Sequence, residues 1–216
     1  QDSNPENKSF LLPAIFTGVY VMIFPFAPPL LRAMIAFTAL AASFSCMVLK
    51  TPLHVPSWGL LVLSLPVISS LQFYLGYPLR VVTGEIATPF LQAMGYSVVR
   101  EGTILRWGED LISIDAPCSG VRMLWVGFYL TFTLASFFQL RIKATVIASF
   151  FAFVSILAGN ALRTAALFFV EIDVFPFPGW IHPGIGILIF LAVGLSILAF
   201  VQFLGKERPC LIAASS

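Results

Sequence analysis

The sequence predicts an all-α polytopic membrane protein with about six transmembrane helices and a small extracytoplasmic cap made of a helix plus a β-hairpin. Of the 216 residues, 59% are apolar and only 10% are charged, whereas a soluble domain carries about 25% charged residues. The mean hydropathy is +0.96. A water-soluble fold of this size cannot bury so much apolar surface. Composition therefore excludes an ordinary soluble enzyme and a disordered chain.

The charge and cysteine content exclude two further classes. The net charge of +2 is too small to attract a polyanion, so no nucleic-acid partner is expected and membrane lipids are the expected surroundings. Three cysteines are too few for a disulfide scaffold. We therefore expect a single membrane domain over residues 1–216.

Six apolar stretches are long enough to be membrane spans. A spanning helix needs about 20 apolar residues, because the hydrocarbon core is about 30 Å thick. The predicted spans are residues 10–27, 30–49, 58–76, 118–140, 144–170 and 183–204.

Lysine and arginine predict the orientation of these spans, because short cytoplasmic loops retain them. With six alternating spans, almost all basic residues near the span ends fall on one side, and only Arg32 opposes the rule. Both termini are then cytoplasmic, and the protein is expected in the cytoplasmic (inner) membrane. The basic residues on that side are Lys8, Lys50, Arg141, Lys143, Lys206 and Arg208.

The opposite, extracytoplasmic side receives the predicted cap, residues 77–117. Apolar residues at spacings of three and four predict a weak amphipathic helix over residues 78–94, broken near Pro89. Short β-branched runs separated by glycine turns over residues 97–114 predict a small hairpin.

Cys118 is the first candidate for chemistry. Pro117 suits the first turn of a helix, so Cys118 would lie where the helix dipole and free N–H groups favour an anion. Its thiol would then have a lowered pKa and be partly thiolate, the nucleophilic form. Gly120 would allow another chain to approach closely. A small cysteine packed at a helix end is an equally good interpretation of these residues.

Arg163 and Asn160 are the second candidate feature. A charge in the otherwise uncharged span 144–170 costs about 2.5–3.5 kcal/mol on insertion scales. Arg163 would lie near the outer interface, and snorkelling to lipid headgroups is one explanation for it. Asn160 lies three residues earlier on the same helix face, which favours a polar patch facing a cavity.

His182 precedes the last predicted span and would lie on the same side as Cys118 and Arg163. An exposed loop histidine is the default interpretation of such a residue. However, cysteine with histidine is a recurrent pair in acyl transfer, and an arginine can stabilise the developing oxyanion.

Other polar residues carry less weight. Arg122 lies one turn after Cys118 and suits either substrate binding or, as we favour slightly, anchoring at the interface. Glu171 suits orienting His182, pairing with Arg163, or simple solvation in a loop. No cluster has metal-ligand spacing and no loop suits a nucleotide, so neither a metal nor a cofactor is expected.

Together these motifs resemble the exosortase/archaeosortase family. The similarity covers roughly residues 77–204, and a histidine at the last position resembles bacterial exosortases. The matching motifs are Ala116-Pro117-Cys118-Ser119-Gly120-Val121-Arg122, Asn160-Ala161-Leu162-Arg163, His182 just before a final span, and the upstream run over residues 90–102.

The resemblance implies a membrane cysteine transpeptidase. It implies Cys118 as nucleophile, His182 as base and Arg163 as the third catalytic residue, with Ser119, Gly120, Arg122 and Asn160 as supporting or substrate-binding residues. The implied partners are exported proteins with a C-terminal sorting signal (PEP-CTERM-like): a short motif, a transmembrane helix and a basic tail. The alternative is a non-catalytic transporter or assembly subunit with a polar cavity at Asn160 and Arg163.

Overall fold

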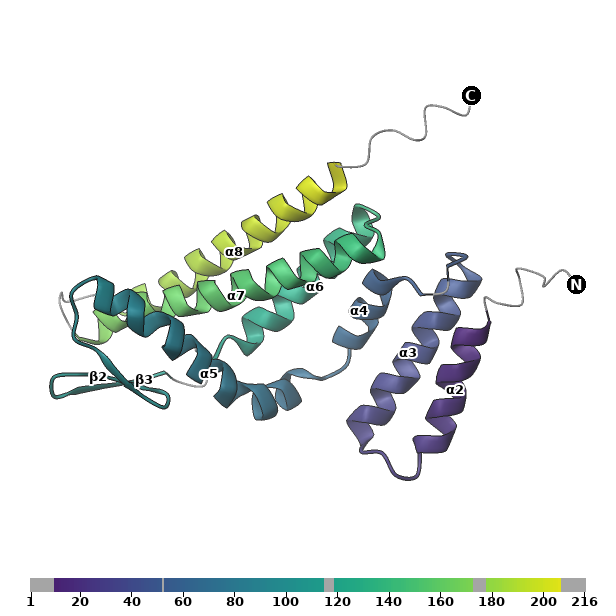
Figure 1. The fold of residues 1–216 in the computed structure, drawn as a ribbon, viewed down its shortest axis with the longest axis horizontal. Coiled ribbons are helices and arrows are strands. Elements are labelled where there is room, and N and C mark those ends of the chain that lie inside the picture. The colour runs from purple at the N-terminus through teal and green to yellow at the C-terminus, as the bar shows by residue number, and fades with distance from the viewer. Residues whose placement is uncertain (1–9, 52, 115–118, 173–177, 207–216) are drawn as a thin grey trace, which may run out of the picture.

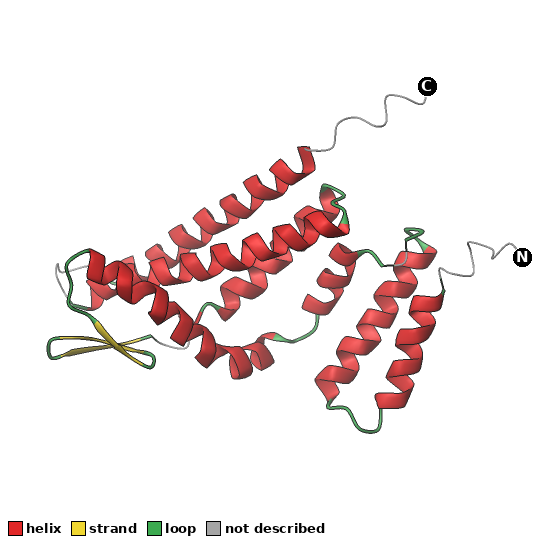
Figure 2. Cartoon of the chain, viewed as in Figure 1, coloured by secondary structure: helices red, strands yellow, loops and turns green. Residues whose placement is uncertain are grey.

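The computed structural model describes residues 10–51, 53–114, 119–172 and 178–206. These segments form an elongated bundle of helices with a small sheet at one end (Figures 1 and 2). The helices are α2 (Leu11–Ile23), α3 (Pro29–Met47), α4 (Val55–Leu63), α5 (Ile68–Ala93), α6 (Val121–Phe137), α7 (Ile142–Glu171) and α8 (Ile181–Lys206). The strands are β1 (Val99–Glu101), β2 (Ile104–Trp107) and β3 (Asp110–Ser113).

Among the described helices, α3, α7 and α8 are each long and apolar enough to cross a membrane. The outward faces of α7 and α8 are apolar as well: Phe150 is 70% exposed, Leu188 is 71% exposed and Leu195 is 63% exposed. Such faces are stable against lipid and would be unstable against water. The helices α2 and α6 are apolar but shorter, at 13 and 17 residues.

The predicted span over residues 58–76 is not one continuous helix. Helices α4 and α5 are long and apolar enough for a membrane span only when they are taken as a pair, and they meet at an angle of 94°. The cause is Pro66, which lies in the break between them and disfavours helical geometry at the residue before it. Trp125 Nε1 donates a 3.1 Å hydrogen bond to the carbonyl oxygen of Leu63, so the carbonyl at the end of α4 is satisfied across the bundle.

The expected break near Pro89 is wrong. Helix α5 continues through both Pro78 and Pro89, so the segment expected to begin a separate cap at residue 77 instead begins in the middle of a 26-residue helix. The helix ends at Ala93, and Gly95, with φ of +93°, then turns the chain toward the sheet.

The sheet is an antiparallel meander of three strands in the order β1-β2-β3 rather than a two-stranded hairpin. Leu105 pairs with Arg100 on one side and with Ile112 on the other. Leu105 is fully buried and belongs to a core that also contains Leu91 of α5 and Phe168 of α7. The sheet is therefore packed against α5 and α7.

Two polar contacts fix the sheet against α5. Arg100 forms an ion pair with Glu85, and the side-chain amide of Gln92 donates a 2.8 Å hydrogen bond to the carbonyl oxygen of Val98. Gly84 of α5 lies against the side chain of Arg100, and a Cβ added there would lie 2.8 Å from Arg100 Cδ. The close approach of sheet and helix thus depends on a residue without a side chain.

The connection between α3 and α4, the connection between α6 and α7, and the end of α8 lie at the end of the bundle opposite the sheet (Figure 1). These segments carry Lys50, Arg141, Lys143 and Lys206. Arg32, which opposes the charge rule, is held where α2 turns into α3: its Nε donates to the carbonyl oxygen of Ala27 at 2.6 Å, and its guanidinium lies 4.8 Å from the ring of Phe24.

We predict that the start of α4 is sensitive to acid through His54, the N-cap of that helix. His54 Nδ1 lies 2.8 Å from Ser57 Oγ and accepts from the Ser57 N–H at 3.4 Å, and burial lowers the pKa of His54 below its ordinary value. The neutral imidazole therefore stabilises the fold, and this contribution is lost as pH falls below about 6.5. Between pH 7 and pH 5 the melting temperature in detergent should fall more for the native protein than for His54→Asn, which keeps a cap that does not titrate. Equal falls would contradict this role.

Candidate active site

The start of α6 differs from the expected helix start at Pro117. The helix begins at Val121, and Gly120 is its N-cap with φ of +78°. This left-handed geometry interrupts the helical path and favours glycine. Residues 115–118, including Cys118, lie outside the described residues. The expectation that Cys118 occupies the first turn of a helix beginning at Pro117 therefore does not apply to α6.

Gly120 packs directly on Asn160 of α7. A Cβ added at Gly120 would lie 2.9 Å from Asn160 Cγ. Asn160 is 2% exposed, and its side-chain amide donates a 2.9 Å hydrogen bond to Thr83 Oγ1 of α5. Next to Gly120, the hydroxyl of Ser119 donates a 3.1 Å hydrogen bond to Gln72 Oε1, also of α5. Asn160 and Ser119 therefore join α5, α6 and α7 at the level of the site.

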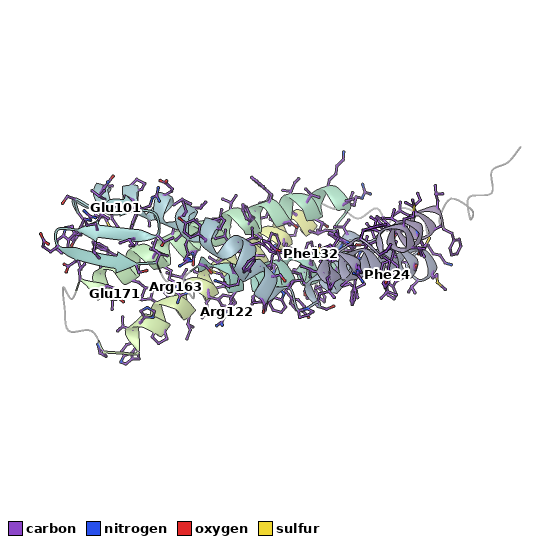
Figure 3. All side chains as sticks on the ribbon, turned by 90° about the horizontal axis from the view of Figure 1, so that it is seen from below. Phe24, Glu101, Arg122, Phe132, Arg163 and Glu171 are labelled. Atoms are coloured by element: carbon purple, nitrogen blue, oxygen red, sulfur yellow. The ribbon has the colours of Figure 1, made fainter. Side chains whose placement is uncertain are left out.

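Arg163 and Arg122 line one pocket of about 430 Å³. We call it the arginine pocket; its walls are Gly120, Arg122, Met123, Val126, Arg163, Pro183, Gly186, Ile187 and Phe190. It lies where the beginnings of α6 and α8 meet the second half of α7. Figure 3 shows Arg122 and Arg163 near each other, in the half of the molecule that carries the sheet.

Arg163 lies against the backbone of α8. A Cβ added at Gly186 would lie 3.3 Å from both Cζ and Nε of Arg163, so the guanidinium fits beside this glycine. Arg163 Nε is buried and has no hydrogen-bond partner in the part of the chain that the structure describes. A buried donor without an acceptor is costly, and it can be satisfied by an anionic or carbonyl oxygen in the pocket. This arrangement favours a binding role for Arg163 over simple anchoring at the interface.

His182 lines a second, smaller cavity of about 40 Å³, which we call the histidine cavity. Its polar walls are Ser113 of β3, Thr164 and Glu171 of α7, and His182. Helix α8 begins at Ile181, so His182 lies in its first turn instead of at the boundary before Pro183. Pro183 lines the arginine pocket and His182 lines the histidine cavity; likewise, Arg163 and Thr164 are neighbours in the chain but line different cavities.

The described residues on either side of residues 115–118 line different cavities. Ile114, the last described residue before them, lines the histidine cavity, and Gly120 lines the arginine pocket. Arg80 Nη1 donates a 3.4 Å hydrogen bond to the Ile114 carbonyl oxygen. Sequence reasoning missed Arg80 and Thr164, because neither belongs to a motif and their importance depends on contacts between distant segments.

We predict that Gly120→Ala destabilises the fold more than a glycine replacement with backbone strain alone. A positive φ costs an alanine about 1–2 kcal/mol, and at Gly120 the new methyl group must also displace Asn160. Gly95→Ala is the matched control, since Gly95 has φ of +93° and nothing within 4 Å of an added Cβ. The melting temperature in detergent should fall further for Gly120→Ala, and equal falls would exclude the contact with Asn160 as a constraint.

Comparison with known families and proteins identifies the chain. Residues 3–199 match the family described as transmembrane exosortase (Exosortase_EpsH). No curated protein and no solved structure matches. Family membership suggests a membrane transpeptidase that acts on sorting signals, and the apolar helices agree with a membrane protein. The match extends over nearly the whole chain, and the protein therefore belongs to the transmembrane exosortase family.

Proposed function

We propose that this exosortase-family protein is a cysteine transpeptidase whose catalytic residues are Cys118, Arg163 and His182. The observation that carries the proposal is the convergence of α6, α7 and α8. Residues just after Cys118, the guanidinium of Arg163 and the residue after His182 line one pocket. A peptide in that pocket would meet a cation whose Nε donor has no partner among the described residues. It would also lie near the backbone N–H groups at the start of α6, of which that of Val121 donates to Ser119 Oγ at 3.4 Å.

In the proposed reaction, the sulfur of Cys118 attacks the carbonyl carbon of the scissile peptide bond. His182 takes the thiol proton, and Arg163 stabilises the negative charge that develops on the carbonyl oxygen. The C–N bond then breaks, His182 returns the proton to the leaving amine, and a thioester remains on Cys118. An acceptor amine or hydroxyl attacks this thioester and releases the sulfur, whereas attack by water would give simple hydrolysis.

The proposed substrates are exported membrane proteins with a C-terminal sorting signal of the PEP-CTERM type. Their transmembrane helix would hold the scissile bond close to the membrane surface, and their basic tail would fix its orientation. Asn160 supports the site because it packs against Gly120 and donates a hydrogen bond to Thr83. Arg122 also lines the arginine pocket, and we assign it to binding substrate carbonyl or carboxylate oxygens.

The proposal places the site on the extracytoplasmic side of the cytoplasmic membrane, with α2, α6 and the bent α4–α5 pair completing six membrane passages. The basic residues at the end of the bundle opposite the sheet support this orientation.

The orientation predicts which positions an impermeant thiol reagent can reach in intact cells. Single cysteines at positions 85 and 110, beside and within the sheet, should react, and cysteines at positions 50 and 143 should react only after the cells are opened. Each would be introduced into a chain in which Cys46, Cys118 and Cys210 are replaced by alanine. Labelling of positions 50 and 143 in intact cells would contradict this orientation and indicate the opposite one.

The catalytic roles predict distinct losses in the processing of a tagged substrate that carries a sorting signal. Cys118→Ala and Cys118→Ser should abolish processing, because a hydroxyl is a poor nucleophile without further activation. His182→Ala should be as severe. Arg163→Lys should lower the rate by about 10²–10³-fold, because lysine lacks the planar fork of donors that stabilises an oxyanion.

Matched variants control for effects on folding. Cys46→Ala changes a buried cysteine of α3, and Arg141→Lys changes an arginine at the other end of α7; both should process substrate at the native rate when expression is matched. Full processing by Cys118→Ala would refute the enzyme and favour the transporter or assembly subunit. Full processing by Arg163→Lys would mean that Arg163 only anchors α7 at the membrane interface.

A further inference from the structure

Thr164 differs from the other buried threonines on the described helices. The hydroxyl of Thr131 donates a 2.7 Å hydrogen bond to the carbonyl oxygen of Gly127, and that of Thr145 donates at 3.2 Å to Arg141. Both bonds run one turn back along the helix, as is usual for threonine. Thr164 is 7% exposed, and its Oγ1 is buried without a hydrogen-bond partner among the described residues. Its hydroxyl therefore lacks the hydrogen bond that the hydroxyls of Thr131 and Thr145 make.

The Thr164 side chain lines the histidine cavity, together with Glu171 and His182. The volume of about 40 Å³ is sufficient for a water molecule, which occupies about 30 Å³ in the liquid. An ordered water needs two to four polar partners, and the buried Thr164 and the exposed Ser113, Glu171 and His182 line this space. Leu167 and Phe168 form part of the apolar wall beside Thr164, whereas Glu171 and His182 are exposed, so a water between these side chains would lie at the mouth of the cavity.

We propose that the histidine cavity binds a water molecule that links Thr164 and Glu171 to His182. The water accepts a hydrogen bond from the Thr164 hydroxyl, donates one to the Glu171 carboxylate, and forms its remaining bond with the imidazole. Thr164 and Glu171 are then positioning residues, because they hold the ring of His182 through the water without touching substrate. This inference rests on the proposed role of His182 as the base.

Thr164→Val tests the water site, because valine has nearly the shape of threonine and lacks the hydroxyl. If the water positions His182, Thr164→Val should lower kcat about tenfold or more with little change in KM, since misplacement of a reacting group is costly. Thr164→Ser keeps the hydroxyl and should restore kcat to within about threefold of the native value. Both would be measured on the tagged sorting-signal substrate with purified protein in detergent.

Thermal stability gives an independent readout. If nothing binds to Thr164, its hydroxyl is a buried unsatisfied group, so Thr164→Val should raise the melting temperature and leave kcat unchanged. That pair of results would overturn the proposal. Thr131→Val is the matched control: it removes a hydroxyl that is already satisfied, so it should lower the melting temperature slightly and leave kcat unchanged.

A double-mutant cycle tests whether Thr164 and Glu171 share one water. Glu171→Gln and Thr164→Val should each lower kcat, and the double variant should be little slower than the slower single variant, because residues that act through one ligand are not additive. If the kcat losses of the two single variants multiply fully in the double variant, Thr164 and Glu171 act independently, and the shared water is overturned. The proposed function fails on a different result, namely processing by Cys118→Ala, and the stability comparison of Thr164→Val with Thr131→Val does not depend on that result.

Discussion

The contact between Gly120 and Asn160 is the constraint on which the arrangement of the site depends. A left-handed glycine lets the chain enter α6 directly over the Asn160 side chain, and that amide in turn is bonded to Thr83. Three helices are thus fixed to one another by a buried polar group. Within lipid such a group must find its partner inside the protein, so the contact determines how α6 lies relative to α7 and where Arg163 meets the beginning of α6.

The site is divided between two cavities of different character. The arginine pocket combines two cations with apolar walls from α6 and α8, which suits a peptide that leaves a membrane helix. The histidine cavity is small and has hydroxyl, carboxylate and imidazole groups. The pairs Arg163–Thr164 and His182–Pro183 each face both cavities, because successive residues on a helix point about 100° apart. Neighbouring residues of one helix can therefore line cavities of different character.

The sequence was sufficient for the features that depend on composition and local pattern. Apolar runs predicted α3, α7 and α8, since length and hydropathy alone decide them. The β-branched runs and glycine turns predicted strands over residues 97–114, although as a hairpin instead of a meander. The break at Pro66 was missed because Leu65 and Val67 kept the run apolar, and α5 continued through Pro89 because a helix packed against α7 and the sheet tolerates one missing hydrogen bond.

The site was predictable only to the level of residue types. Arg163 stood out because charge is costly within an apolar span, and His182 because of its place before the last helix. The start of α6 could not be predicted, since the positive φ of Gly120 depends on its packing against Asn160. The pairing of Thr164 with the histidine cavity also depends on the distant strand β3, which no local pattern specifies.

The short helices and the bend between α4 and α5 have a consequence for the surrounding lipid. A helix of 17 residues such as α6 is only about 25 Å long, and α2 is shorter still, whereas α7 and α8 exceed the usual hydrocarbon thickness. The perimeter of the protein therefore combines helices of unequal length. Bilayers adapt to short segments by thinning and to long ones by allowing tilt. Headgroups and water would then lie deeper beside α6 than beside α7, and under the proposed function a peptide bond at the edge of a neighbouring membrane helix could descend to Arg163 without unwinding that helix.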